Sequence, residues 1–499
     1  MRKISVLLVV LFFVSCRTIF AAEGDVVWTR TYNGTASGND QGRDIAVDGS
    51  GNVYVTGFEW VNLEDWNIWV RKYDSSGNEV WTRTHNGTAN GNDEGCGIVV
   101  DRSGNVYVIG SEKVLMELQN IWVRKYDTDG DEVWTKTYNS VANQFDIGRG
   151  IAIDDSGNVY VTGSETVGGA SQNIWVRKYD TDGDVVWTKT YNGTANGQDV
   201  GEGIAVDGGG NVYVTGYETV SGESYNIWVR KYDSEGDVLW TRTHNGTAND
   251  WDLGLDIAVD GSGNVYVIGY EMVSGESYNI WVRKYDSAGN EVWTRTHNGL
   301  ANNADEGRGI AVDGSGNVYV TGDEFVTGED PNVWTRKYDQ DGSEVWTRTY
   351  NGVINGPDAG FGLAIDGSGS VYVTGCEWVS GEQNNIWVRK YEGVFGEHFE
   401  PPVEGGVKIQ GGEKGYVNPG EGEKAKIHFQ PSGAGRVNVK IYTLRGLLVW
   451  EGSKSVSGVQ DFIEWNCRNK ENKVVASGIY AVYVEGPGIN VTKKVAILK

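Results

Sequence analysis

The sequence contains few of the residues that build metal centres and disulfide frameworks. Among 499 residues there are only 4 Cys, 5 His, 3 Met and 7 Pro. Three cysteines, Cys96, Cys376 and Cys467, follow the first 22 residues, and an odd number without short spacing excludes a disulfide framework and a zinc site. We therefore interpret these cysteines as incidental.

Positive charge is also scarce. The 43 Lys and Arg residues are outnumbered by 68 Asp and Glu residues, which gives a net charge of −25. Phosphate backbones and anionic lipids repel a chain of this sign, which argues against nucleic acid and membrane surfaces as partners. With 39% hydrophobic and 11% aromatic residues, the chain can nevertheless bury a large core.

Long hydrophobic runs are absent apart from one near the start of the chain. Basic residues precede an apolar run over residues 4–14, which is too short to span a bilayer and is typical of a secretory signal. We expect residues 1–22 to form a signal peptide and the protein to be exported, extracellular or at a bacterial cell surface. In the alternative, residues 13–16 act as a loose lipobox and Cys16 carries a lipid anchor. No later segment is predicted to be transmembrane.

Glycine and aromatic residues are abundant, and they lie in an internal repeat. There are 72 Gly, 20 Trp and 26 Tyr. The segment Val53-Tyr54-Val55-Thr56-Gly57 returns with a constant step of 53 residues. A period of this length is typical of solenoids, propellers or arrays. The copies begin at Val53, Val106, Val159, Val212, Val265, Val318 and Val371.

Each unit of the repeat predicts four β-strands. Its apolar runs are short, rich in β-branched and aromatic residues, and bounded by Asp, Gly, Asn and Ser, with no helical period. The fold class is therefore all-β, and four strands repeated seven times predict a seven-bladed β-propeller over residues 27–391. In the first unit the runs cover residues 45–48, 53–57, 68–74 and 80–85.

The order of the runs predicts how the ring closes. The chain opens on a fourth-strand run at residues 27–33, and the seventh unit stops after its third run. We expect residues 27–33 to complete the last blade, so that both ends of the repeat pair in one sheet and no edge is exposed. An open β-solenoid with capping units is the alternative.

The repeated motifs also resemble a known family. The stretch Asp48-Gly-Ser-Gly-Asn-Val-Tyr-Val-Thr-Gly57, followed by Ile68-Trp-Val-Arg-Lys-Tyr-Asp74, is similar to the bacterial β-propeller repeat called SBBP. The resemblance covers about residues 27–391 and implies an extracytoplasmic propeller, mostly without an assigned reaction. It therefore supports a fold more than a chemistry.

A second module follows the repeat. Residues 392–420 contain Pro401, Pro402, Pro419 and many Gly and Glu residues, which predict a linker. Residues 421–499 contain alternating apolar runs separated by Gly-rich turns, which predict a small Ig-like β-sandwich.

The C-terminal module resembles the FlgD-type Ig-like module and the type A sorting domain of type IX secretion. The resemblance rests on residues 439–446, 465–469 and 475–480. It implies recognition by outer-membrane secretion machinery, for export or surface attachment. The family usually has an acidic residue and a Gly after the Trp, where this chain has Asn466 and Cys467. A plain Ig-like stalk without an export role is the alternative.

Two sets of carboxylates recur once per repeat, in positions that a propeller would place on one rim. One hypothesis is a rim that binds Ca²⁺ or a cationic ligand, because hard cations prefer oxygen ligands; its metal ligands would be Asp40, Glu59, Asp358 and Glu377. The alternative is loop capping, in which the carboxylates accept backbone N–H bonds. The sets are Asp40, Asp93, Asp146, Asp199, Asp252, Asp305 and Asp358, and Glu59, Glu112, Glu165, Glu218, Glu271, Glu324 and Glu377.

The residue after each of these glutamates differs between repeats. In a closed ring Met272, Phe325, Trp378 and Trp60 would be neighbours. We call these four residues the aromatic crescent, and we predict that it stacks sugar rings or grips a protein partner. The alternative is that these side chains only fill space between neighbouring loops.

These observations predict an exported, non-catalytic propeller that binds a glycan or an extracellular protein at its loop rim. No catalytic residue is assigned, because His85, His244 and His297 stand where other repeats have Tyr, and nucleophile and phosphate-loop motifs are absent. A glycan-active hydrolase or lyase that uses rim carboxylates is one alternative, although we identify no charged cluster that breaks the repeat. A purely structural surface or adhesion protein is another.

Overall fold

The computed structural model describes residues 23–168, 171–393, 407–410, 417, 419, 424–443, 447–458, 461–470 and 472–497. The expected signal peptide over residues 1–22 and the alternative lipidation site Cys16 lie outside the described residues. The described residues are all-β and contain no α-helix. Among them, therefore, no helix has the length and apolarity needed to cross a membrane.

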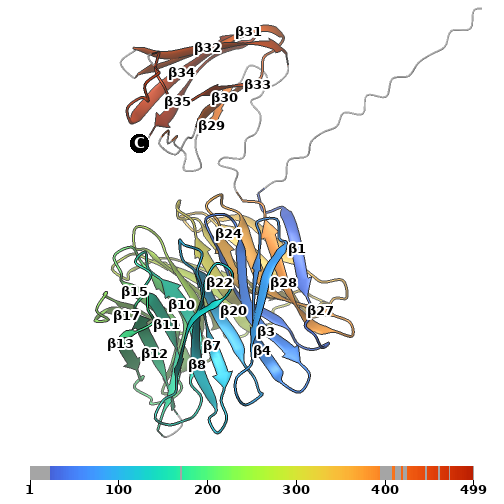
Figure 1. Ribbon diagram of the computed structural model, residues 1–499, viewed down its shortest axis with the longest axis vertical. Coiled ribbons are helices and arrows are strands. Elements are labelled where there is room, and N and C mark those ends of the chain that lie inside the picture. The colour runs from blue at the N-terminus through green and yellow to red at the C-terminus, as the bar shows by residue number, and fades with distance from the viewer. Residues whose placement is uncertain are drawn as a thin grey trace, which may run out of the picture.

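Residues 26–391 form seven antiparallel four-stranded sheets that resemble propeller blades (Figure 1). The first strands are β2 (Gln41–Val47), β6 (Glu94–Val100), β10 (Ile147–Ile153), β14 (Val200–Val206), β18 (Leu253–Val259), β22 (Glu306–Val312) and β26 (Ala359–Ile365). The second strands are β3 (Val53–Val61), β7 (Val106–Lys113), β11 (Val159–Val167), β15 (Val212–Val220), β19 (Val265–Met272), β23 (Val318–Phe325) and β27 (Val371–Val379).

The other two strands of each sheet continue the meander. The third strands are β4 (Asp65–Tyr73), β8 (Gln119–Tyr126), β12 (Ser171–Tyr179), β16 (Ser224–Tyr232), β20 (Tyr278–Tyr285), β24 (Pro331–Tyr338) and β28 (Gln383–Tyr391). The fourth strands are β5 (Glu79–His85), β9 (Glu132–Tyr138), β13 (Val185–Tyr191), β17 (Val238–His244), β21 (Glu291–His297), β25 (Glu344–Tyr350) and, from the start of the chain, β1 (Val26–Tyr32).

The last sheet combines the two ends of the repeat. Its strand order is β1-β28-β27-β26, and Tyr32 of β1 pairs with Ile386 of β28. The first strand of each sheet contacts the first strand of the next, and β26 in turn contacts β2. The missing fourth strand of the seventh sheet is thus supplied by the N-terminal strand, as the order of the sequence runs predicts.

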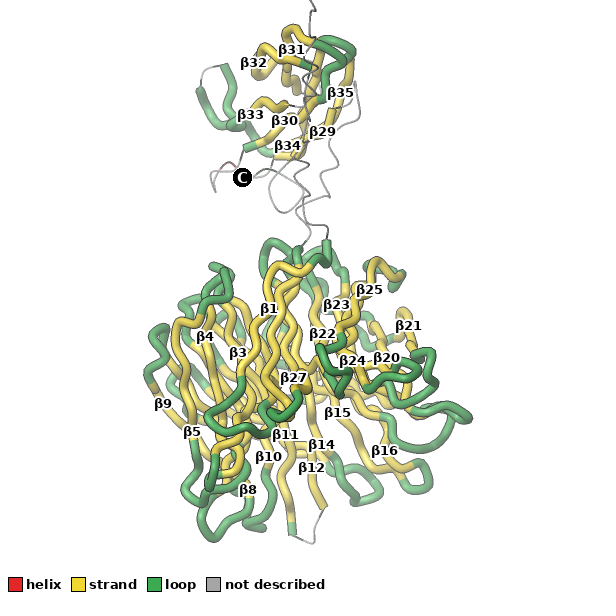
Figure 2. The backbone as a smooth tube through the Cα atoms, turned by 90° about the vertical axis from the view of Figure 1, so that its right-hand side faces the viewer, coloured by secondary structure: helices red, strands yellow, loops and turns green. Residues whose placement is uncertain are grey.

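The strands run between two sets of loops (Figure 2). We call one set the loop face; it contains the segments before each first strand, such as residues 33–40, and the hairpins between second and third strands, such as residues 62–64. The turns at the other end are held by aspartates. Asp48 Oδ1 accepts the N–H groups of Ser50 at 2.8 Å and Asn52 at 2.9 Å. Burial opposes the charge of Asp48, but these hydrogen bonds leave its pKa below the ordinary value.

The hydrophobic core lies between consecutive sheets. The cluster between the last and the first sheet joins Trp28 and Ile386 to Ile45 and Trp69. Trp69 is fully buried, and the Tyr32 ring stacks on it with the ring centres 5.2 Å apart. The repeated tryptophans thus pack between neighbouring sheets.

A β-bulge interrupts every first strand near the loop face. Gly42 pairs with Gly57, and Asp44 pairs with Thr56, so that Arg43 is the extra residue. The bulge requires glycine in the second strand, because a Cβ at Gly57 would overlap the carbonyl oxygen of Gln41. This close approach explains the repeated Gly that ends each Val-Tyr-Val-Thr-Gly motif.

Three strand boundaries differ from the sequence prediction. The first strand begins at Gln41 rather than near residue 45, the second extends to Val61 rather than ending at residue 57, and the third begins at Asp65 rather than at residue 68. Glu59 and Trp60 therefore lie in strand β3 and not in a loop. These extensions contain polar residues such as Gln41, Arg43, Asp44 and Glu59, so the sequence shows no clear apolar alternation there.

The C-terminal unit consists of two sheets that share one hydrophobic core. Trp465 and Phe429 of the smaller sheet and Val439 and Val482 of the larger one are all fully buried in this core. The smaller sheet has the order β29-β30-β33 and comprises β29 (Val407–Gln410), β30 (Ala425–Phe429) and β33 (Asp461–Trp465). The larger sheet has the order β32-β31-β34-β35 and comprises β31 (Ala434–Thr443), β32 (Leu448–Ser457), β34 (Gly478–Gly486) and β35 (Ile489–Ile497).

The boundary of this unit requires a correction. The sequence places residues 392–420 in a linker, yet β29 pairs with β30, and Val417 forms a bridge with Ile497. Val407 is buried in the core. The unit therefore begins by residue 407, and its first strand was missed because it is short and is flanked by Gly and Glu.

Replacement of a bulge glycine should destabilise the fold. A Cβ at Gly216 would overlap the carbonyl oxygen of Val200, whereas a Cβ at Gly208 would meet nothing within 4 Å. We expect Gly216→Ala to lower the free energy of unfolding by about 1–3 kcal/mol, as overpacking does, and Gly208→Ala to leave it nearly unchanged. Urea unfolding followed by tryptophan fluorescence measures both, and equal midpoints for the two variants would contradict this account of the bulge.

Candidate functional site

The repeated aspartates of the loop face cap backbone. Asp40 is fully buried; its Oδ2 accepts the N–H of Gly34, and its Oδ1 accepts the N–H of Trp60, both at 2.6 Å. Burial raises the pKa of Asp40 to about 6, against the effect of the two backbone hydrogen bonds. The same pair of bonds recurs in every sheet, at Asp93, Asp146, Asp199, Asp252, Asp305 and Asp358.

The repeated glutamates tie neighbouring sheets together. Tyr32 of the last sheet donates its hydroxyl hydrogen to Glu59 of the first sheet at 2.7 Å. Where the repeat has His instead, the contact persists: His85 Nε2 lies 2.8 Å from Glu112. The exchange of Tyr and His is thus a packing feature, as the sequence indicates. The other pairs are Tyr138–Glu165, Tyr191–Glu218, His244–Glu271, His297–Glu324 and Tyr350–Glu377.

These contacts bear on the proposed cation site at Asp40, Glu59, Asp358 and Glu377. All four carboxylates already accept hydrogen bonds from the protein. In the described part of the chain, no group of three or more His, Cys, Asp or Glu side chains is arranged to hold a metal ion. The geometry therefore favours the capping alternative over Ca²⁺ binding.

The aromatic crescent lies at the loop-face end of four second strands. Trp60 pairs across β3 and β4 with Trp66, and it packs on Gly38, because a Cβ there would overlap the indole. Trp378 packs on Gly356 in the same way. All four crescent side chains, Trp60, Met272, Phe325 and Trp378, are half-buried. They leave part of their surface to solvent, but the tryptophans also fill space above loop glycines.

Sequence reasoning missed a second group of residues, which breaks the repeat. The extra residue of each bulge lies at the loop-face end of a first strand, and its chemistry differs from sheet to sheet. This corrects the statement that no charged cluster departs from the repeat. In the aligned repeats this position holds both positively and negatively charged residues, which is a signal that the sequence contains. Only the bulge in the structure shows that these side chains face inward. The residues are Arg43, Cys96, Arg149, Glu202, Leu255, Arg308 and Phe361.

Contacts between different sheets show that these side chains converge. Arg43 and Arg308 each lie over the ring of Phe361, with the guanidinium carbon 4.9 Å from the ring centre. Arg308 forms ion pairs of 2.7 Å with Glu306 and Asp323. We call the group formed by the bulge residues and their acidic partners the channel cluster.

Two ion pairs of the channel cluster are loose. Arg43 lies 3.8 Å from Glu94, and Arg149 lies 3.6 Å from Glu202. These distances are too long for direct hydrogen bonds. The Nε of Arg149 is buried and has no hydrogen-bond partner. The side chains of Arg43 and Arg149 keep 30% and 37% of their surface exposed. Both pairs therefore retain unused hydrogen-bonding capacity.

The pKa shifts follow from this crowding. Burial lowers the pKa of Arg43, and the positive charges of Arg149 and Arg308 act in the same direction. Glu202 raises the pKa of Arg149, whereas burial raises the pKa of Glu202 and of Glu306. The cluster thus holds three guanidinium groups and several carboxylates in a confined space.

A cavity adjoins the channel cluster. Its volume is about 400 Å³, and it is lined by residues of six first strands, including Ile45, Ile98, Ile151, Ile204 and Val259. These residues follow the bulge positions along each strand, so the cavity lies on the side of the channel cluster that is away from the loop face. Two half-buried aspartates join first strands here: Asp44 accepts the Ile98 N–H at 2.8 Å, and Asp256 accepts the Ile310 N–H at 2.9 Å.

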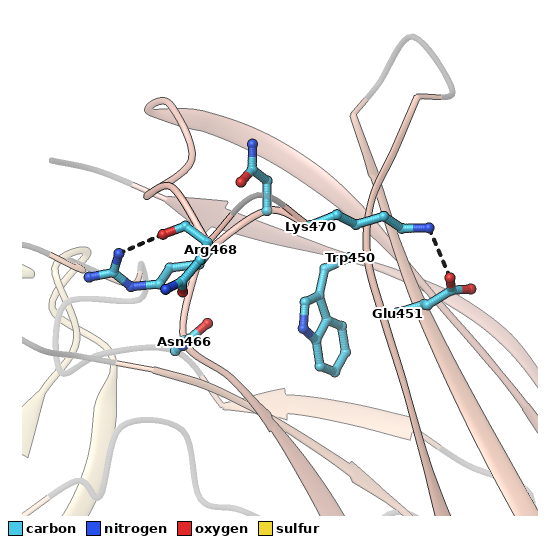
Figure 3. A pocket seen from close by; sticks show the side chains of 7 residues that line it. Trp450, Glu451, Asn466, Arg468 and Lys470 are labelled. Carbon is cyan, nitrogen blue, oxygen red and sulfur yellow. Dashed lines mark hydrogen bonds and ion pairs between the residues drawn. The ribbon is translucent and has the colours of Figure 1, made fainter.

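The C-terminal unit has its own concave surface (Figure 3). A pocket of about 420 Å³ lies beside Trp450, and Lys470 pairs with Glu451 at 2.8 Å. Cys467, where the resembling family has Gly, is buried with φ of 57°. This left-handed conformation explains why glycine is usual there. The pocket lining is Trp450, Glu451, Asn466, Arg468, Asn469, Lys470 and Asn472.

Comparison with protein families identifies the repeat. The SBBP family, described as a beta-propeller repeat, matches residues 27–57, 81–111, 137–164, 187–217 and 298–323. The chain contains SBBP beta-propeller repeats. Four of the five matched segments begin in the fourth strand of one sheet, and all five end in the second strand of the next, so they include the capping aspartates and the bulges. A search among curated protein sequences gives no match.

Solved structures offer distant likenesses. PorZ of Porphyromonas gingivalis, a bacterial surface component of the type IX secretion system, is 15% identical with a TM-score of 0.39; the match covers 96% of this chain and 60% of PorZ. The β-propeller domain of the Trilobed protease from Pyrococcus furiosus is 12% identical with a TM-score of 0.41, over 70% of this chain and 96% of that domain. The chain thus spans only 60% of the length of PorZ.

Removal of one cap charge should destabilise the loop face. Asp199 is fully buried and accepts N–H groups from Gly193 at 2.5 Å and Thr219 at 2.8 Å. An amide at this position keeps one acceptor and turns a donor toward the other N–H. We expect Asp199→Asn to lower the free energy of unfolding by about 1–3 kcal/mol, and Asp182→Asn, at an exposed turn, to have almost no effect. Thermal unfolding measures both; an unchanged Asp199→Asn variant would refute the capping role.

Mild acid should stabilise the propeller. Burial raises the pKa of Asp40, Asp93 and Asp44 to about 6, and that of Asp256 to about 7. The folded state therefore binds more protons than the unfolded state between about pH 4 and pH 7, and stability rises as pH falls through this window. We expect the urea midpoint to increase from pH 7 to pH 5, and to increase less in Asp256→Asn. A midpoint that falls over this range would contradict the assignment.

Proposed function

We propose that the chain is an exported, non-catalytic, closed seven-bladed β-propeller that binds a glycan or an extracellular protein at its loop face. The proposal rests on the positions at which the seven repeats differ from one another. The capping aspartates and the tying glutamates are the same in every sheet, whereas the channel cluster and the aromatic crescent differ from sheet to sheet. A residue that stabilises the scaffold is expected in every repeat, whereas a residue that binds one ligand is needed only once.

The closed ring is supported by the strand pairing and by the core. Strand β1 completes the last sheet, and one hydrophobic cluster joins that sheet to the first. Export is supported by the predicted signal peptide at residues 1–22. We further propose that the C-terminal unit is an Ig-like module for export or surface attachment through outer-membrane secretion machinery, on the strength of its resemblance and its two-sheet core.

A glycan-active hydrolase or lyase is a second candidate. One observation favours it: burial raises the pKa of Glu202 and of Glu306 in the channel cluster, as a general acid requires. Both glutamates face an arginine, however, and such pairing also occurs in purely structural networks. A structural or adhesion role would need neither group.

Retention on a glycan array, with and without Ca²⁺, tests the proposed function. We expect at least one glycan, or one extracellular protein spotted on the same array, to retain the chain. We expect no shortened glycan to be released. Trp60→Ala with Trp378→Ala should weaken retention several-fold, because half-buried indoles that keep part of their surface open are strong binding residues. Leu239→Ala, on the outer strand β17 and 53% exposed, is the matched control.

Two outcomes would overturn this reading of the loop face. Release of shortened glycans would establish the enzyme alternative, and the carboxylates of the channel cluster would become its first candidates. Failure to retain any glycan or protein would leave a structural propeller. Retention that depends on Ca²⁺ would revive the cation hypothesis for the rim carboxylates.

A further inference from the structure

We propose that one hydroxyl group of a neutral glycan bridges the side chains of Arg149 and Glu202, with the adjoining part of the glycan stacked on the aromatic side chains of Tyr225 and Trp251. This inference rests on the proposed function and assigns its ligand class and its site. It places the site in the third to fifth sheets, whereas Phe325, Trp378 and Trp60 of the aromatic crescent lie in the sixth, seventh and first sheets, and only Met272 shares the fifth.

The Arg149–Glu202 pair has the geometry to receive hydroxyl groups. The two side chains come from the bulges of neighbouring first strands, and their nearest atoms are 3.6 Å apart. A sugar hydroxyl can accept a hydrogen bond from a guanidinium and donate one to a carboxylate at the same time. The Arg149 side chain keeps 37% of its surface exposed and the Glu202 side chain keeps 17%, so atoms of both groups are open to a ligand.

An aromatic series leads from this pair to the loop face. Tyr217 lies close enough to Glu202 for that charge to raise its pKa, in addition to the larger effect of burial. The rings of Tyr217 and Tyr225 have centres 4.9 Å apart, and those of Tyr225 and Trp251 have centres 5.6 Å apart. Trp251 is 46% exposed. The series therefore offers apolar ring surface beside polar groups, which is the combination that a pyranose requires.

The charge balance favours a neutral ligand over an anion. The three arginines of the channel cluster are accompanied by Glu94, Glu202, Glu306 and Asp323. The cluster therefore has no excess of positive charge, and the chain as a whole carries −25. An anionic ligand would meet repulsion at this site, whereas hydroxyl groups meet matched donors and acceptors.

The repeat itself provides an internal comparison. In the second sheet the bulge residue is Cys96, and the positions equivalent to Tyr217 and Tyr225 are Ser111 and Gln119. The fifth sheet repeats the two tyrosines as Tyr270 and Tyr278, but its bulge residue is Leu255, and Ala304 stands at the position of Trp251. Among the seven repeats, only this sector combines the charged pair with two tyrosines, which lie in strands β15 and β16, and an exposed Trp. This coincidence of rare residues in one sector marks it as a site rather than as filling.

The test is calorimetric titration of the purified protein with maltohexaose, cellohexaose, xylohexaose and mannohexaose. Variants are Trp251→Ala, Glu202→Gln and the double variant Trp60→Ala with Trp378→Ala. Trp251 is exposed, so its replacement is expected to leave the fold intact, and circular dichroism checks this for each variant. We expect at least one oligosaccharide to bind, Trp251→Ala and Glu202→Gln to weaken that binding at least tenfold, and the double variant to change it less than twofold.

Other outcomes separate this inference from the proposed function. Binding that is lost only in the double variant would overturn the inference and support the crescent as the site. Retention of an extracellular protein without binding of any of the four oligosaccharides would likewise overturn the inference, while the proposed function stands. Absence of both glycan and protein binding would overturn both.

Discussion

Burial of sheet faces between neighbouring sheets is the interaction on which the rest of the structure depends. A four-stranded sheet in this chain has apolar residues on both faces, so it cannot be stable alone. Trp69 and its repeats are fully buried between sheets, and they are covered by the Tyr or His of the preceding fourth strand. The hydrogen bond from that same Tyr or His to a glutamate fixes the two sheets near the loop face.

This packing separates scaffold from site. The seven sheets are held in register by the tryptophans, the capping aspartates and the tying glutamates. The residue at the bulge position is therefore not needed to stabilise the fold. The bulge turns its side chain inward, and the glycine opposite makes the bulge sterically feasible. Each sheet can therefore contribute a different residue to the channel cluster without disturbing the packing of the neighbouring sheets. The diversity of Arg43, Cys96, Glu202 and Phe361 reflects this freedom.

Much of the fold could be predicted from the sequence because the repeat is so regular. The number of strands per unit, the packing role of the tryptophans and the use of residues 27–33 in the last sheet all follow from spacing. The first strand was predicted too short, because Gln41, Arg43 and Asp44 give it no apolar alternation. Its extension depends on contacts with the next sheet, which no local pattern shows.

The candidate site was harder to predict for the same reason. The tie between Tyr32 and Glu59 joins different sheets, so the glutamates resemble a cation rim until the sheets are placed side by side. The crescent residues were found because they follow a repeated glutamate. The channel cluster was missed because its residues stand in a polar stretch, and only the register shift reveals that they converge.

The shared last sheet has a consequence for the order of folding. Strand β1 pairs with a strand more than 350 residues later, as the Arg389 to Thr29 hydrogen bond across 360 positions shows. The first six sheets can form as the chain emerges, but β1 has no partner until residues 383–391 have been made. Trp28 and Tyr32 can pack on Tyr73 and Trp69 of the first sheet before then, but the part of their cluster that comes from β27 and β28 is still missing. We therefore expect the pairing of β1 with β28 to be the slowest step of folding, because it brings together the most distant segments of the repeat.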